Sequence, residues 1–481
     1  MLVLVPVSCG VKAREGRMAR TADVPGGLED PTSGGTPTTE ARKVEILPLV
    51  ELKVTGDDGN PLNKIATTAV SDLEQYWTVE FPKVYDDKYV PLKGGLFAYG
   101  SDTDPSTLPC PADSIDAMMG NAFYCPTDDA VAWDQEQLLP YLASEYGDFT
   151  VAVVLAHEWG HVIQQRAGGF EASVFTELQA DCFAGSWVAH VHDSTRTHFD
   201  VNTAVLDQAL GGVLFLKDAP GITSDEPTAH GSGFDRVGAF QDGFENGAAA
   251  CKGYLDGKVQ PFQFPFTSQA DLDNEGNLPL EDSVDLDGQT VPGIKTQAIS
   301  SLEDYWTKEF PKLGGGTWKR LQKPVEFDKS DPPTCDGEEV TSFRLFLCVP
   351  EHRIGYSSDL VEQAYKRYGD FGVATLLGSQ YGLDVQVELD DVPDDVTLMT
   401  RRGDCYTGAW TAEMIPDENG DPADPDLSLV LSPGDLDEAV GVLLGIRSES
   451  DRIRQGPGFD RVRAFRTGVL QGAEACKDLK D

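Results

Sequence analysis

The sequence lacks any run of about 20 apolar residues, so we expect no membrane-spanning helix. Basic side chains are scarce: 38 lysines and arginines accompany 80 aspartates and glutamates, and the formal net charge is -42. Such an acidic chain repels phosphate backbones and anionic headgroups, which excludes nucleic acid and a bare lipid surface as partners. Histidine is also rare, with seven residues in 481. A pattern that brings two histidines together is therefore informative.

The size and composition fit two globular domains of about 200 residues each. The first residues, MLVLVPVSCG, resemble the end of a bacterial lipoprotein signal, in which Cys9 becomes the lipidated first residue. A short disordered terminus is the alternative. Residues 10–41 are rich in Gly, Pro, Thr and charge, which is typical of a flexible tether. We therefore expect residues 1–41 to be a truncated signal-like or lipoprotein-like segment with a tether, and membrane contact only through a lipid anchor at Cys9.

The rest of the chain contains an internal sequence repeat. The string SDLEQYWTVEFPK from Ser71 returns as SLEDYWTKEFPK from Ser301, and LDQALGGVL from Leu206 returns as LDEAVGVLL from Leu436. Three shorter strings also recur in the same order: YGDF at 146 and 368, DCFAG and DCYTG at 181 and 404, and GFDRV at 233 and 458. The sequence thus predicts a tandem duplication, with domains at 42–256 and 286–481 and a Pro/Asp/Gly-rich linker at 257–285.

Eight of the nine cysteines follow the duplication, four in each copy, and Cys9 is left over. Two disulfides per domain suit this count, although three pairings per domain are open in principle. A metal site on cysteines is the rival, but the sequence has no close CxxC pair. We expect local pairing, Cys110–Cys125, Cys182–Cys251, Cys335–Cys348 and Cys405–Cys476. Disulfides need an oxidising compartment, so we expect export to the cell envelope, lipid-anchored at the outer face of the membrane, or secretion.

The first copy carries a metal-binding pattern. From Val151 the sequence reads VAVVLAHEWGHVIQQRAGGF, an apolar run that ends at two glycines and predicts a helix of about 17 residues. His157 and His161 are four residues apart, so both imidazoles project from one helix face and can share a tetrahedral metal. Glu158 is placed to take a proton from a water that the metal activates. Two buried core histidines are the alternative.

A second helix supplies two carboxylates. It begins near Glu177, in ELQADC, and Glu177 and Asp181 share a face at four-residue spacing. Glu177 can complete a set of two histidines and one carboxylate, which leaves a fourth position for water. Asp181 can hold the free ring nitrogen of a ligand histidine. An ordinary solvated helix face would also carry these acids. The sequence predicts one Zn²⁺ per chain, in the first domain.

Four ordered motifs of the first copy carry a family resemblance. They are AFYCPTDDAVAWD from Ala122, GDFTVAVVLAHEWGH from Gly147, ELQADCFAG from Glu177 and HGSGFDR from His230. Together they closely resemble the bacterial family of putative neutral zinc metallopeptidases. The resemblance implies a zincin-like α+β fold, mainly helical, with a small β-hairpin beside the active-site helix. The same fold is expected in the second copy.

The second copy acts as an internal control. Alignment through YGDF places Ser379, Gln380 and Leu383 opposite His157, Glu158 and His161, and Thr400 stands opposite Glu177. This copy should fold without binding metal or hydrolysing peptides.

Gln455 stands where the first copy has His230. His230 is therefore a candidate donor to the oxyanion of the reaction, with an exposed loop histidine as the alternative.

The expected function is a zinc-dependent peptidase in the bacterial cell envelope or outside the cell, acting on a peptide or protein substrate. In this mechanism Glu158 passes the proton on to the leaving amine. The second domain is expected to bind substrate or regulate the first. The alternative is a non-catalytic envelope protein with a structural zinc and a pseudopeptidase domain that binds peptides or proteins.

Overall fold

The structure is a computed structural model that describes residues 28–29, 43–226, 229–266, 268–284, 288–416, 424, 426–427 and 429–480. Cys9 and most of the predicted tether lie outside these described residues. The described part is α+β and mainly helical, as the sequence predicts. Within it, no helix has the length and apolar character needed to cross a membrane.

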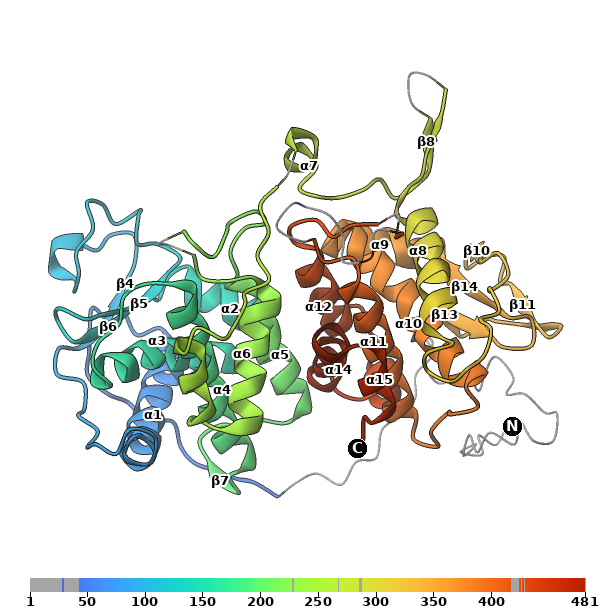
Figure 1. The fold of residues 1–481 in the computed structure, drawn as a ribbon. Coiled ribbons are helices and arrows are strands. Elements are labelled where there is room, and N and C mark those ends of the chain that lie inside the picture. Colours follow the sequence, from blue (N-terminus) through green and yellow to red (C-terminus); the bar gives the residue numbers. More distant parts are fainter. Residues whose placement is uncertain are drawn as a thin grey trace. The chain divides into compact units, whose positions relative to one another are not determined.

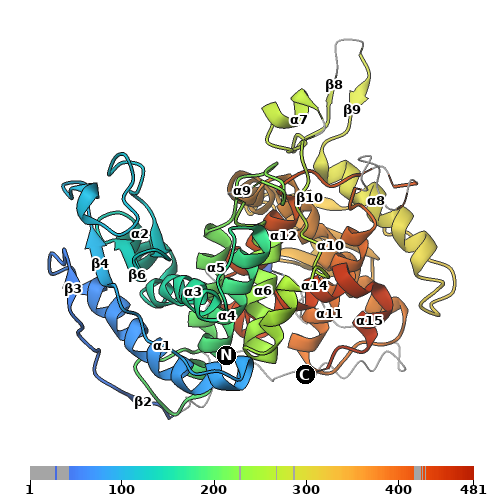
Figure 2. The same cartoon turned by 60° about the vertical axis from the view of Figure 1, so that its left-hand side comes forward.

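The chain divides into two compact units, which we call the first unit (Glu40–Gln263) and the second unit (Phe264–Asp481). Leu28 and Glu29 also belong to the second unit. The division falls within the predicted linker at 257–285. Figure 1 and Figure 2 show the first unit in blue to green and the second in yellow to red.

The first unit combines helices with a small sheet (Figure 1). Its helices are α1 (Pro61–Tyr85), α2 (Leu138–Tyr146), α3 (Phe149–Arg166), α4 (Val174–Asp193), α5 (Thr203–Phe215) and α6 (Gly233–Asn246), with 3₁₀ turns η3 (Pro105–Thr107) and η4 (Ala250–Leu255). Its strands are β2 (Glu45–Ile46), β3 (Val54–Thr55), β4 (Gly95–Tyr99), β5 (Ala122–Cys125), β6 (Ala130–Asp134) and β7 (Arg196–Thr197). The helix predicted around the HEWGH string is α3.

Local sequence signals set the ends of the helices around the site. Helix α3 stops before Gly168 and Gly169, whose positive φ angles of 130° and 91° suit glycine. Helix α4 then starts with a capping box, in which the side chains of Ser173 and Thr176 satisfy each other's backbone N–H groups. The short turn between α3 and α4 lets the two helices pack together.

Glycines allow α4 to approach both of its neighbours closely. A Cβ on Gly160 of α3 would lie 2.6 Å from the Cα of Ala180, and a Cβ on Gly185 of α4 would lie 1.9 Å from the carbonyl oxygen of Phe240 in α6. Neither position has room for a side chain. Helix α4 is thereby held between α3 and α6, and side chains from all three helices can meet.

The sheet of the first unit has the strand order β3-β4-β6-β5. Strands β3, β4 and β6 are parallel, and β5 pairs antiparallel with β6, with Tyr124 opposite Val131. The β5–β6 pair is the hairpin that the family resemblance implies. Strand β5 contacts α3, so the edge of the sheet lies beside the helix that carries His157 and His161.

The second unit repeats this order of elements. Its helices are α7 (Gln269–Asp273), α8 (Ile294–Glu309), α9 (Ser358–Tyr368), α10 (Asp370–Glu388), α11 (Val396–Ala412), α12 (Asp435–Gly445), α13 (Glu449–Gln455), α14 (Gly458–Gln471) and α15 (Ala473–Lys477). Its strands are β8 (Ser283–Val284), β9 (Thr290–Val291), β10 (Val325–Phe327), β11 (Thr334–Cys335), β12 (Glu338–Glu339), β13 (Phe343–Cys348) and β14 (Arg353–Ser357). Helix α11 packs between α10 and α14 as α4 does between α3 and α6.

The sheet of the second unit has the order β1-β13-β14-β10, with β10 parallel and β13 antiparallel to β14. Strand β1 is Leu28–Glu29, which pairs antiparallel with β13. These two residues therefore have a defined place within the segment predicted to be a flexible tether. Leu28 is 2% exposed.

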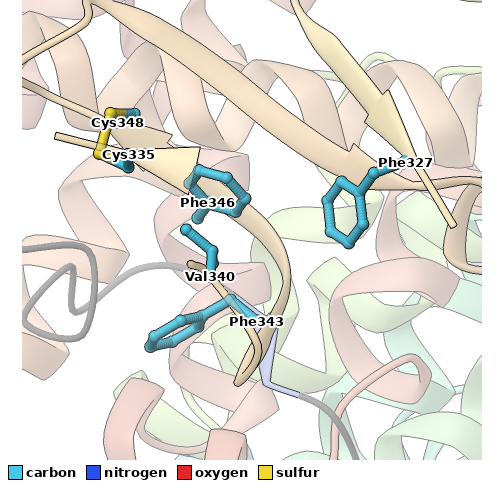
Figure 3. Close-up of a cluster of buried hydrophobic side chains, with 6 residues drawn as sticks. All are labelled: Phe327, Cys335, Val340, Phe343, Phe346 and Cys348. Atoms are coloured by element: carbon cyan, nitrogen blue, oxygen red, sulfur yellow. A yellow bond between two sulfur atoms is a disulfide. The ribbon is translucent and has the colours of Figure 1, made fainter. Parts of the chain in front are cut away.

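Phe343 and Phe346 of β13 pack with Phe327 and Val340 next to the Cys335–Cys348 disulfide (Figure 3). All four predicted disulfides are present: Cys110–Cys125, Cys182–Cys251, Cys335–Cys348 and Cys405–Cys476. In each unit one disulfide closes a short loop at the sheet and the other ties α4 or α11 to the end of the unit. The second pair spans 69 residues in the first unit and 71 in the second.

Candidate metal centre

Helix α3 presents His157 and His161 on one buried face. Their rings lie 4.9 Å apart, centre to centre, and are nearly perpendicular at 89°. The residues are only 6% and 8% exposed. Phe170, just after the glycine turn, stacks on the His161 ring at 5.2 Å. The four-residue spacing thus produces the shared face that the sequence predicts.

Glu177 of α4 reaches both histidines. Its Oε2 lies 3.2 Å from His157 Nε2, and its Oε1 lies 3.4 Å from His161 Nε2. Two ligands of a tetrahedral zinc ion are separated by about 3.3 Å when each bond is about 2.05 Å long. The three groups lie within the distance that one metal ion can span. The donor set of two imidazoles and one carboxylate therefore fits zinc.

The other ring nitrogen of each histidine has a partner that fixes the tautomer. His157 Nδ1 lies 2.7 Å from Asp181 Oδ1, and His161 Nδ1 lies 2.8 Å from Gln164 Oε1. Each oxygen accepts the Nδ1 proton, so each Nε2 keeps its lone pair for a metal. Gln164 is held in turn, because its Nε2 donates to the carbonyl of Thr176 at 2.7 Å. The sequence predicted the role of Asp181 and missed Gln164.

Arg236 of α6, the last residue of the HGSGFDR motif, is a further member of the site whose role the sequence did not reveal. Its Nε and Nη2 donate to Asp181 at 2.8 and 3.0 Å, and it also donates to the Leu216 carbonyl. Arg461 and Asp404 form the same pair in the second unit, both contacts at 2.7 Å. The retention of both residues in both copies was the signal that could have found this pair. Asp181 therefore has two contacts, one structural and one to His157.

Glu158 lies on the adjacent face of α3, beside the sheet. Its Oε2 accepts the backbone N–H of Tyr124 in β5 at 2.9 Å, and the residue is 7% exposed. Burial raises the pKa of this carboxyl above its usual range. The FYCP motif thus supplies a backbone donor that orients Glu158 next to the histidines.

The carboxylates around the two imidazoles favour the protonated form of each ring. Burial alone lowers the pKa of His157, but the charge and hydrogen bond of Asp181 and the hydrogen bond of Glu177 raise it to about 10. Burial alone raises the pKa of Glu177, yet hydrogen bonds from both histidines hold it well below its usual range. The carboxylates therefore stabilise positive charge at the two imidazoles. A divalent cation can take the place of these protons.

His230 is 57% exposed at its side chain and pairs with Asp218. Its backbone N–H donates to Asp218 Oδ2 at 2.7 Å, and its Nδ1 lies 3.2 Å from Oδ1. The next residue, Gly231, lies against Leu178 of α4. The loop therefore lies near the start of the helix that carries Glu177, and its role in the reaction stays a prediction.

The matching positions of the second unit form hydrogen bonds of a different kind. Ser379 donates to the Leu376 carbonyl at 2.7 Å, and Thr400 donates to the Val396 carbonyl at 3.0 Å, each within its own helix. Leu383 is an apolar side chain that is 3% exposed. Gln386 keeps the scaffold contact of Gln164, because its Nε2 donates to the Met399 carbonyl at 3.1 Å.

Known proteins resemble part of this chain. An uncharacterized protein of Mycobacterium tuberculosis is 32% identical over 151 residues, which is 26% of this chain and 52% of that protein. A Mycobacterium bovis protein matches equally. The uncharacterized protein YpfJ of Escherichia coli K12 is 28% identical over 215 residues, or 39% of this chain and 69% of YpfJ. The chain spans about half the length of the mycobacterial relatives that it matches. No solved structure matches it.

A family described as putative neutral zinc metallopeptidase matches residues 51–172 and 165–254. Both segments lie in the first unit. They include the two histidines of α3, the carboxylates of α4, the hairpin and Arg236. This part of the first unit therefore matches the putative neutral zinc metallopeptidase family.

Proposed function

We propose that the first unit hydrolyses peptide bonds with a zinc ion held by His157, His161 and Glu177. The observation that carries this proposal is the arrangement of the imidazoles. Both Nδ1 atoms are engaged by acceptors, and both Nε2 atoms face one carboxylate at 3.2 and 3.4 Å. Three ligands leave one coordination position for water or substrate, which is typical of catalytic zinc sites.

The residues around these ligands have separate tasks in the proposed reaction. Zinc supplies a Lewis acid that lowers the pKa of water and polarises a carbonyl group. Glu158 accepts a proton from the attacking water and delivers it to the leaving amine. The Tyr124 N–H holds one Glu158 oxygen, which leaves the other oxygen for proton transfer. Asp181 and Gln164 keep the imidazoles in the ligand tautomer.

The proposed location is outside the cytoplasm, in the bacterial cell envelope or beyond it. The four disulfides support this proposal, because reducing compartments keep thiols unpaired. The substrate is a peptide or protein, and the second unit binds substrate or regulates the first. Cys9 as a lipid anchor falls outside the described residues.

The substitution Glu158→Gln tests the proposed function. The variant should keep one zinc ion per chain and lose roughly 10²–10⁴-fold in the hydrolysis of a fluorogenic peptide library, because glutamine cannot accept the proton. His157→Ala should lose the zinc ion, whereas Ser379→Ala, its counterpart in the second unit, should keep it.

Full hydrolysis by Glu158→Gln would refute the role of this residue. Zinc retention without hydrolysis of any peptide by the unaltered chain would favour a structural zinc in a non-catalytic protein.

A further inference from the structure

A cluster of three acidic side chains lies in the second unit, apart from the metal centre of the first. Asp370 is the first residue of α10, and Asp435 and Glu438 lie in the first turns of α12. One carboxylate oxygen from each of them lies within 4.8 Å of the other two. Asp370 and Asp435 are only 3% and 4% exposed.

One oxygen of this cluster lacks a hydrogen-bond donor. Asp370 Oδ2 accepts the backbone N–H of Leu278 at 2.8 Å, but Asp370 Oδ1 is buried and meets no N–H or hydroxyl donor among the described residues. The carboxyl group of Glu438 lies within hydrogen-bond reach of the Asp370 side chain. A buried carboxylate oxygen without a donor is costly unless a cation or a proton meets it. The unsatisfied oxygen is the observation, independent of the acidic composition, that indicates a ligand.

The charges that act on the cluster are acidic. Burial raises the pKa of Asp435 well above its usual range, and Asp370, Glu438 and Asp437 raise it further. Burial also raises the pKa of Asp370, to about 6. Asp370 and Asp435 begin their helices, and a helix N-terminus compensates only part of a full negative charge. The group therefore needs a bound cation or shared protons at neutral pH.

A loop of the linker that includes Asn277 and Leu278 packs on the cluster. Asn277 Oδ1 accepts the backbone N–H of Asp370 at 2.8 Å, and Leu278 contributes the N–H described above. Tyr365 of α9 holds this loop by donating to the Leu278 carbonyl at 2.8 Å. Gly276 packs closely on Ser432, since a Cβ there would lie 2.8 Å from that side chain. The loop removes the carboxylates from water.

The first unit provides a comparison for this cluster. Asp148 is the counterpart of Asp370 and is exposed, while Val205 and Gln208 stand where the second unit has Asp435 and Glu438. Helices α3 and α5 of the first unit begin within two residues of the matching positions, so the fold does not require three acids there. The acidic cluster is specific to the second unit.

We propose that Asp370, Asp435 and Glu438 bind a calcium ion that fastens the linker loop to the second unit. Calcium binds oxygen ligands at about 2.4 Å, so oxygens on opposite sides of the ion are about 4.8 Å apart. Magnesium requires bonds of about 2.1 Å and keeps most of its water, which suits a buried carboxylate cluster less well. Zinc favours nitrogen and sulfur ligands, which this cluster lacks.

A calcium titration tests this site. The full-length protein is first passed over a chelating resin and reloaded with one zinc ion per chain, and calcium is then added. Calorimetry should show one additional calcium ion with a Kd below about 1 mM. Calcium should also raise the thermal midpoint of the second unit, and an equal concentration of magnesium should raise it less.

Matched variants locate the site. Asp370→Asn keeps the shape of the side chain and should weaken calcium binding by about tenfold or more, because it removes one charged ligand. The double substitution Asp435→Val with Glu438→Gln installs the residues of the first unit and should have the same or a larger effect. Asp148→Asn, the counterpart in the first unit, should bind calcium as the unaltered chain does.

Two outcomes would overturn the proposal. One is that calcium gives no heat of binding and no shift of the thermal midpoint in the unaltered protein. Protons shared among the carboxylates would then be what neutralises the cluster. The other is calcium binding that persists undiminished in both Asp370→Asn and the double variant. If the double variant fails to fold, Asp370→Asn and the titration of the unaltered chain still test whether the cluster binds calcium.

Discussion

The buried pair of Asp181 and Arg236 offers the sharpest test of how the candidate metal site is built. Asp181 is 1% exposed and accepts from Arg236 at 2.8 and 3.0 Å and from His157 at 2.7 Å. The substitution Asp181→Asn keeps the shape but removes the charge and one acceptor oxygen. Arg236, 2% exposed, is then left with an uncompensated charge. Breaking a buried pair in this way costs about 3–5 kcal/mol of unfolding free energy.

The same substitution should weaken zinc binding. Without a carboxylate at Nδ1, His157 is a poorer ligand and is less firmly held in the required tautomer. Loss of such a partner typically reduces metal affinity by about 10–100-fold, which corresponds to roughly 1.4–2.7 kcal/mol. The single substitution Asp181→Asn is therefore expected to lower both the unfolding free energy and the zinc affinity, for two different reasons.

The second unit separates the two effects. Asp404 and Arg461 form the same buried pair, but Ser379 stands where the first unit has His157. Asp404→Asn should destabilise its own unit by a similar amount and leave zinc affinity unchanged.

Competition with a chromophoric chelator gives zinc affinity, and calorimetric unfolding gives stability. The reasoning fails if Asp181→Asn binds zinc normally, or if Asp404→Asn weakens zinc binding as much as Asp181→Asn does.

Three further predictions follow from the packing. Gln164→Leu removes the acceptor of His161 Nδ1 and should weaken zinc binding about tenfold, whereas Gln386→Leu, its counterpart, should not; chelator competition measures both. Gly185→Ala forces α4 away from α6 and should lower the unfolding free energy by about 1–3 kcal/mol in a denaturant titration, and an unchanged midpoint would contradict the close approach. Replacing Cys182 and Cys251 by serine opens a loop of 69 residues and should cost about 4 kcal/mol, which thermal unfolding under non-reducing conditions checks against the unaltered chain.

Much of the candidate site could be predicted because its spacing is local. The four-residue interval of His157 and His161 sets their common face through helix geometry alone, and the same holds for Glu177 and Asp181. Gln164 was missed although it is three residues from His161, because glutamine on a helix has many other uses. Arg236 was missed because its contact with Asp181 joins residues 55 positions apart.

The sequence by itself predicted the duplication, the mainly helical α+β class and the donor types of the candidate metal site, and it favoured the four local disulfide pairs over the other pairings. Each of these depends on periodicity, on spacing or on the comparison of two copies within one chain. Only the tertiary structure decided that Glu177 reaches both imidazoles, that Leu28 and Glu29 pair with β13, and that Asp370 meets two acids of α12. These contacts depend on how helices and strands distant in sequence pack, and packing is set by close approaches that no local pattern encodes.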